Sequence, residues 1–166
     1  MMTPIHILVT LDENYLPPLR VMLTSLFVNN PGEKIEVWML YRSIPGIEIN
    51  NLRELCENYN AVLHPLRADG SMWGSAPTSS RYPQEMYYRL LAPHLLPGTF
   101  DRVLYLDPDI LVINPLRPLW RSNTIISIPA FCLLTLSRGE KKLIRRRCSN
   151  IRKNIKKSYY FPIRIS

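Results

Sequence analysis

The chain of 166 residues lacks several features that would assign it to a class at once. Its three cysteines (Cys56, Cys132 and Cys148) lie far apart and form no C-x-x-C pair, so the sequence predicts neither a disulfide framework nor a zinc site. The first residues carry no basic segment or cleavage signal. The longest apolar stretch, residues 125–136, is shorter than the roughly 20 residues that cross a bilayer. We therefore expect a reduced, cytoplasmic protein without a signal peptide or a transmembrane helix.

The charge of the chain is distributed unevenly. Residues 1–120 hold 9 Lys/Arg and 12 Asp/Glu, whereas residues 121–166 hold 12 and 1, so the net charge of +8 comes from the tail alone. The basic stretches at residues 137–148 and 152–157 follow neither a helical nor a strand period. We expect a folded domain at 1–121 and a non-native or disordered tail at 122–166, which we interpret as out-of-frame translation.

Apolar residues alternate between strand and helix periods over the first 66 residues. Strands are predicted at 5–10, 34–41 and 61–66, and helices at about 16–28 and 49–58. Strands that alternate with helices predict an α/β fold with a mainly parallel sheet. Ligands of such sheets bind beyond the carboxyl ends of the strands.

Two carboxylates follow the apolar strand that begins at Arg102. Pro108 favours an extended backbone at Asp107, and in extended backbone residues i and i+2 share a side, so Asp107 and Asp109 are predicted to face one point. Such a pair repels unless a cation lies between the two groups, and hard divalent ions prefer oxygen ligands. An Asp that follows a strand is also common as a turn residue, which stays an alternative.

Three segments together resemble motifs of the family 8 glycosyltransferases, which are retaining enzymes that include bacterial lipopolysaccharide galactosyltransferases and glycogenin. They are Leu-Tyr-Leu-Asp-Pro-Asp-Ile-Leu-Val at 104–112, which is followed by Leu-Arg-Pro-Leu-Trp at 116–120, Asp-Glu-Asn-Tyr at 12–15, and Tyr-Tyr-Arg-Leu at 87–90. The resemblance implies a Rossmann-like GT-A fold. It also implies that Asp107 and Asp109 hold Mn²⁺ or Mg²⁺ on the diphosphate of a UDP-sugar.

The resemblance further implies a set of donor-binding residues: Thr10, Asp12, Asn14, Tyr15 and Arg89. A carboxylate or amide can pair with the edge of uracil, a tyrosine ring offers a flat face, and an arginine suits phosphate. The alternatives are that Asp12 or Asn14 caps the following helix and that Arg89 is a solvated helix residue.

The family's later motifs, which include Asn-X-Gly, Asp-Gln-Asp and a late histidine, are not found after residue 121. The resemblance therefore covers the N-terminal half of a GT-A domain. We expect an apparently truncated chain, an inactive fragment in which the acceptor-side residues that set stereochemistry and substrate are missing, and we name no catalytic residue. The loop predicted at 67–81 contains Trp73, and a helix is predicted at 84–95. We interpret His6, His64 and His94 as packing or surface residues.

The expected function is a metal-dependent retaining glycosyltransferase that transfers a hexose from a UDP-sugar to a glycan, a lipid-linked saccharide or another cell-envelope acceptor. The basic tail is expected to contact the inner face of an anionic membrane. Nucleic acid is not expected as a partner. The alternative is a tail-driven protein that binds nucleic acid or an anionic membrane. An Asp-X-Asp phosphatase fits less well, because the pair comes late and Ile110 and Leu111 follow it.

Overall fold

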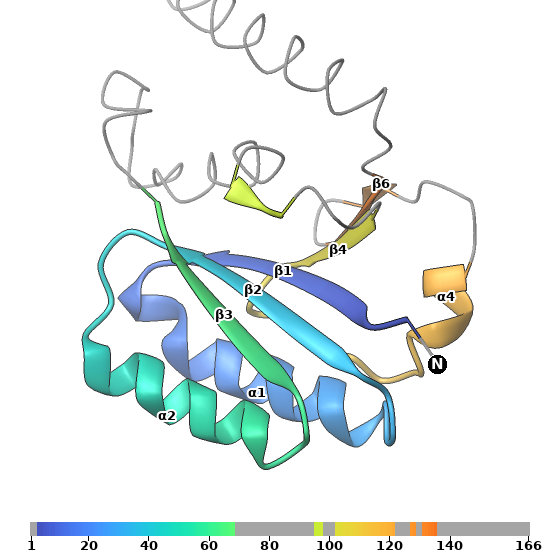
Figure 1. Ribbon diagram of the computed structural model, residues 1–166, viewed down its shortest axis with the longest axis horizontal. Helices are drawn as coiled ribbons and strands as arrows, with labels where there is room; N and C mark the ends of the chain where they lie inside the picture. The colour runs from blue at the N-terminus through green and yellow to red at the C-terminus, as the bar shows by residue number, and fades with distance from the viewer. Residues whose placement is uncertain (1–2, 69–94, 98–101, 122–126, 129–130, 136–166) are drawn as a thin grey trace, which may run out of the picture.

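The computed structural model describes residues 3–68, 95–97 and 102–121 in full, and residues 127–128 and 131–135 by their backbone (Figure 1). Three predictions fall outside the described residues: most of the loop at 67–81 with Trp73, most of the helix at 84–95 with Arg89, and the basic stretches of the tail.

One sheet organises the described part of the chain, in the order β3-β2-β1-β4-β6-β5. Its strands are β1 (Ile5–Leu11), β2 (Ile35–Tyr41), β3 (Val62–Arg67), β4 (Arg102–Leu106), β5 (Ser127–Ile128) and β6 (Phe131–Thr135). The first four strands are parallel, whereas β6 is antiparallel to β4 and β5 is antiparallel to β6. The predicted α/β fold with a mainly parallel sheet is therefore confirmed.

Two long helices cover one face of this sheet (Figure 1). The helical elements are η1, a single 3₁₀ turn (Glu13–Tyr15), α1 (Leu16–Val28), α2 (Gly46–Glu57) and α4 (Arg117–Arg121). Prolines occupy the first turn of α1, where a backbone N–H has no helical partner. α2 begins three residues earlier than the predicted start at 49, directly after Pro45.

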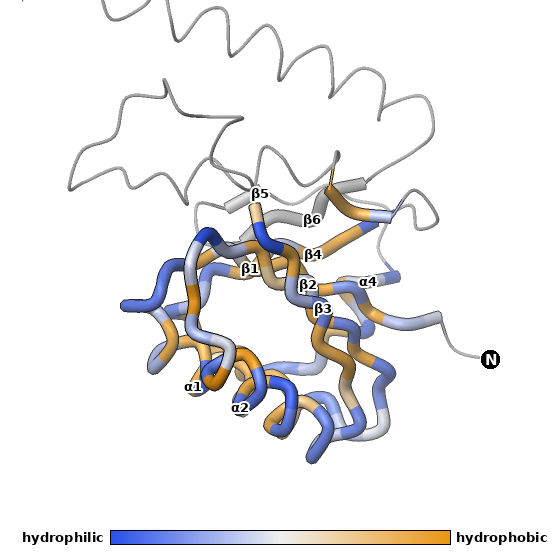
Figure 2. The backbone as a smooth tube through the Cα atoms, turned by 60° about the vertical axis from the view of Figure 1, so that its left-hand side comes forward, coloured by the Kyte–Doolittle hydropathy of each residue, from blue (hydrophilic) through white to orange (hydrophobic). Residues whose placement is uncertain are grey.

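The core lies between the two helices and the sheet. Alternate residues of the central strands point into it, and each is at most 3% exposed: Ile5, Ile7, Val9, Leu11, Ile35, Val37, Met39, Leu104 and Leu106. Figure 2 shows hydrophobic residues concentrated along the strands and alternating with hydrophilic residues along α1 and α2. Each buried aliphatic side chain contributes about 1.5–3 kcal/mol, which makes this face the main source of stability.

The opposite face of the sheet carries a polar and aromatic cluster across β1, β2 and β3. The rings of Trp38 and His64 stack with centroids 4.0 Å apart. One carboxylate oxygen of Glu36 lies 3.2 Å from His64 Nε2 and 3.6 Å from His6 Nδ1. Burial lowers the pKa of His6. Both histidines therefore pack against other side chains on this face of the sheet, in agreement with their interpretation as packing or surface residues.

Strands β5 and β6 lie beyond the division that we predicted after residue 121. Their backbones pair with each other and β6 pairs with β4, for example at Tyr105 and Cys132. This part of the expected tail therefore extends the sheet, and the division of the chain at residue 121 stays a prediction. Among the described helices, none is long and apolar enough to cross a membrane.

Candidate functional site

Two acidic turns lie at the same edge of the sheet because β1 and β4 are parallel neighbours. The register pairs Ile7 with Leu104 and Leu8 with Tyr105. Counting on from these pairs, Thr10 is level with Asp107, and adjacent strands lie about 4.8 Å apart. Both turns therefore follow the carboxyl ends of adjacent parallel strands, where ligands of open α/β sheets bind.

The first turn follows β1 and is organised by Asp12. The Asp12 Oδ1 atom accepts a hydrogen bond of 2.8 Å from the Asn14 N–H, so Asp12 caps the 3₁₀ turn η1. The alternative kept above was a cap of the helix that follows, and α1 has Tyr15 at its N-cap and no side-chain cap hydrogen bond. Asn14 is exposed and Tyr15 is 41% exposed, so both residues are accessible to a ligand.

The second turn follows β4 and holds the acidic pair. Pro108 is buried, Asp107 is half-buried and Asp109 is exposed. Pro108 and Asp109 form a turn rather than a continuation of the strand, so the convergence of both carboxylates on one point stays a prediction. Within the described part of the chain, neither carboxylate has an ion-pair or hydrogen-bond partner. Carboxylate oxygens are the kind of ligand that a hard divalent cation prefers, but no group of three or more His, Cys, Asp or Glu side chains that could hold a metal is found among the described residues.

Thr10 and Tyr105 connect the two strands just below these turns. Thr10 is 6% exposed and Tyr105 is 5% exposed, and their hydroxyl oxygens lie 3.3 Å apart. Thr10 was predicted as a donor-binding residue, and in the structure its hydroxyl is engaged with Tyr105. The remaining predicted donor-binding residue, Arg89, lies outside the described residues.

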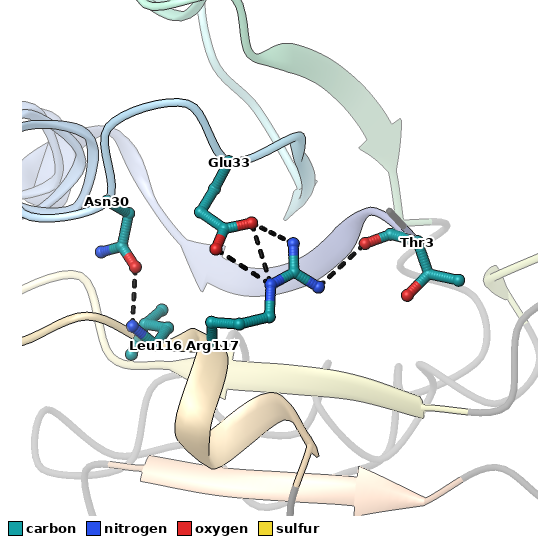
Figure 3. Close-up of polar contacts among 5 residues, drawn as sticks. All are labelled: Thr3, Asn30, Glu33, Leu116 and Arg117. Atoms are coloured by element: carbon teal, nitrogen blue, oxygen red, sulfur yellow. Dashed lines mark hydrogen bonds and ion pairs between the residues drawn. The ribbon is translucent and has the colours of Figure 1, made fainter. Parts of the chain in front are cut away.

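The segment after the acidic pair is held by contacts that the sequence analysis did not predict. Figure 3 shows Asn30 Oδ1 accepting a 2.6 Å hydrogen bond from the Leu116 N–H. It also shows Arg117, which forms a forked ion pair with Glu33 and donates to the Thr3 carbonyl at 3.0 Å. Arg117 lowers the pKa of Glu33, and Glu33 raises the pKa of Arg117. The sequence contains Asn-Asn-Pro-Gly at 29–32, which predicts a turn, and Leu-Arg at 116–117 within a motif, but neither predicts the contact between them.

A pocket of about 290 Å³ lies away from the acidic turns. It is lined by residues at the end of α1, the start of β2 and the end of α2, among them Phe27, Glu33 and Tyr59. These residues surround the amino ends of the strands, which is the edge opposite the acidic turns. We therefore do not assign this pocket to the candidate site.

The topology and the position of the acidic turns define an α/β domain whose candidate ligand site lies at the carboxyl edge of its parallel strands. A family model described as glycosyl transferase family 8 matches residues 6–161, and the chain belongs to this family. The match extends through the two antiparallel strands at 127–135 and into the basic tail.

Solved structures show the same fold. The crystal structure of the galactosyltransferase LgtC in complex with donor and acceptor sugar analogs has a TM-score of 0.75 at 19% identity, over 95% of this chain and 67% of that chain. The glycosyltransferase GlyE of Streptococcus pneumoniae has a TM-score of 0.71 at 16% identity, over 95% of this chain and 40% of that one. The GT-A fold implied by the sequence is therefore confirmed.

Curated relatives match about two thirds of the chain. A lipopolysaccharide 1,2-glucosyltransferase of Escherichia coli is 28% identical over 109 residues, which is 66% of this chain and 32% of the relative. The general stress protein A of Bacillus subtilis is 28% identical over 117 residues, which is 69% of this chain and 41% of the relative. The chain thus spans less than half the length of these relatives.

Proposed function

We propose that the chain forms the donor-binding part of a metal-dependent retaining glycosyltransferase. Such an enzyme transfers a hexose from a UDP-sugar to a glycan, a lipid-linked saccharide or another cell-envelope acceptor. Membership of family 8 supports a glycosyltransferase, and one curated relative is named for lipopolysaccharide. A cytoplasmic location, with the basic tail near an anionic membrane surface, belongs to the same proposal.

One observation carries the proposal: two acidic turns end neighbouring parallel strands, and the carboxylates of the second turn are free of described partners. Free carboxylates attract a cation, and a cation attracts the phosphates of a nucleotide. The first turn presents an exposed aromatic ring and an exposed amide at the same edge, where a base can stack and pair.

The residues of the proposed site divide into three groups with different roles. Asp107 and Asp109 hold Mn²⁺ or Mg²⁺, and Asn14 and Tyr15 contact the nucleoside. Asp12 fixes the conformation of the first turn through its cap and leaves its second carboxylate oxygen for the nucleoside.

Two further parts of the proposal concern the remaining donor-side residues and the chemistry. Thr10 forms the floor between the strands together with Tyr105, and Arg89 reaches the phosphates. When bound, a divalent ion acts as a Lewis acid that offsets the negative charge of the departing diphosphate. We assign no catalytic residue, and turnover of this chain by itself is not part of the proposal.

The test measures the thermal stability of the full chain with UDP, in the presence of Mn²⁺ or of EDTA. A ligand at about 100 times its Kd stabilises the folded state by about 2.7 kcal/mol. For a protein of this size each kcal/mol raises Tm by about 2–4 °C. We expect UDP with Mn²⁺ to raise Tm by roughly 5–10 °C and UDP with EDTA to raise it much less.

The double substitution Asp107→Asn and Asp109→Asn should abolish the part of the shift that depends on manganese. The control is Glu54→Gln, which removes an exposed carboxylate from α2 and should leave the shift unchanged. If the wild-type chain responds to heparin and to salt but not to UDP with Mn²⁺, the tail-driven binding protein described above is the better explanation.

A further inference from the structure

The segment that follows the acidic pair has no strand partner among the described residues, yet its backbone is firmly bonded. The Val112 N–H donates to Ser25 Oγ at 3.0 Å, and Asn29 Nδ2 donates to the Val112 carbonyl at 2.9 Å. Both polar backbone groups of one residue are therefore satisfied by α1, in the way that a neighbouring strand would satisfy them. Val112 itself is 6% exposed and packs into the core.

Ser25 lies in the last turn of α1 and Asn29 is the C-cap residue four positions later, so the two side chains lie on the same side at the end of the helix. Each side chain is also fixed to its own helix. Ser25 Oγ donates to the Met22 carbonyl at 2.7 Å, and Asn29 Nδ2 donates to the Ser25 carbonyl at 3.0 Å. Anchored side chains of this kind hold a partner at a defined position, because little rotamer freedom remains to be lost.

These contacts fix both ends of the acidic turn. On one side, β4 ends at Leu106 within the sheet, and on the other side Val112 is bonded to α1. The five residues between them include Asp107 and Asp109. The same helix begins directly after Tyr15, so α1 is attached to the first turn at its start and to the second turn near its end.

We propose that Ser25 and Asn29 are positioning residues that hold the Asp107–Asp109 turn in place relative to the turn at Asp12–Tyr15, and so set the affinity for the divalent ion. The inference rests on the proposed function, since it takes the acidic pair as the metal ligands. Neither residue touches the ion or the nucleotide. They act through the backbone of Val112.

The experiment uses the full chain and the single substitutions Ser25→Ala and Asn29→Ala. Binding of Mn²⁺ at saturating UDP is measured from the electron paramagnetic resonance signal of the free ion, and UDP binding without metal is measured by equilibrium dialysis. Loss of groups that orient metal ligands typically lowers affinity 10- to 100-fold. We expect each variant to bind Mn²⁺ about tenfold more weakly and to bind UDP alone within twofold of the wild type.

Matched controls separate positioning from a general loss of stability. Thr24→Ala removes a hydroxyl that donates to the Arg20 carbonyl within α1. Asn58→Ala removes the same residue type at the C-cap of α2. Neither control should change the Mn²⁺ affinity. Ser25→Thr keeps the hydroxyl, so it should bind Mn²⁺ as tightly as wild type, in contrast to Ser25→Ala.

Hydrogen exchange supplies a readout that does not require bound metal. The Val112 amide should exchange at least tenfold faster in Ser25→Ala than in wild type, whereas amides of β1 should be unchanged. Two results would overturn the positioning role but leave the proposed function standing. The first is that wild type, Ser25→Ala and Asn29→Ala all bind Mn²⁺ with UDP equally well. The second is that Thr24→Ala weakens Mn²⁺ binding as much as Ser25→Ala does. If wild type does not bind Mn²⁺ with UDP, the proposed function fails, and the positioning role fails with it.

Discussion

Replacement of Asn30 by leucine tests how strongly the segment after the acidic pair depends on a single buried amide. Asn30 is 4% exposed. Its Oδ1 accepts from the Leu116 N–H at 2.6 Å, and its Nδ2 donates to the Leu26 carbonyl at 2.8 Å. Leucine has the same branching of side-chain heavy atoms, although its two methyl groups are larger, and it satisfies neither backbone group. The substitution therefore removes both hydrogen bonds.

The expected magnitude follows from the two groups that lose their partner. A buried polar group left without a hydrogen bond costs about 1–3 kcal/mol, so the loss of two partners in Asn30→Leu should lower the free energy of unfolding by about 2–6 kcal/mol. Native domains have only about 5–15 kcal/mol of stability in total. At about 2–4 °C for each kcal/mol, Tm should fall by roughly 4–24 °C.

The assay is urea unfolding of the full chain followed by circular dichroism, with Asn51→Leu as the control. Asn51 is an exposed residue of α2, and its replacement should change the free energy of unfolding by less than about 0.5 kcal/mol. If Asn30→Leu is as stable as Asn51→Leu, the amide does not hold Leu116, and the reasoning about this network is wrong.

Three further predictions concern titratable groups. Arg117 lowers the pKa of Glu33 in the folded state, so the ion pair stabilises the fold fully above the ordinary glutamate pKa of about 4.3. This stabilisation is lost as pH falls through the lower folded pKa. Glu33→Gln should remove this loss, which is measured as the fall of the urea midpoint at acidic pH. Burial lowers the pKa of His6, so stability should fall as pH drops below about 6.5 and through the folded value, and His6→Asn should remove this dependence between pH 7 and 5. Burial raises the pKa of Cys56 to about 12 and its side chain is 0% exposed, so iodoacetamide at pH 8 should alkylate it only after urea unfolding, as followed by peptide mass spectrometry.

Local patterns in the sequence were sufficient to predict the elements that face the core. The alternation of Ile5, Ile7 and Val9 is a strand period, and the spacing of Leu19, Leu23 and Leu26 is a helical period, so each element could be identified from its own residues. The observed strand β1 and helix α1 agree with these predictions to within one residue.

The contacts that hold the acidic turn could not be predicted in this way. Ser25 and Val112 are 87 positions apart, and Asn30 and Leu116 are 86 apart, so no local period links them. The prediction of extended backbone through Asp109 used the usual restraint before proline. In the structure a turn begins at Pro108 instead, because the chain leaves the sheet after Leu106 and runs to α1.

The wide sequence separation of β1 and β4 also affects how the chain is made. Residues 3–67 contain β1, β2, β3 and both long helices, and they emerge from the ribosome before Arg102 does. Synthesis proceeds at about 5–20 residues per second, so roughly 2–7 s pass between the completion of β3 and the start of β4. Until then β1 has no β4 to pair with. During this interval one side of the central strand is an unpaired edge that includes Ile7 and Leu8, which is the kind of edge that recruits foreign strands. A slow codon between residues 68 and 102 therefore lengthens the time for which this edge of β1 is exposed.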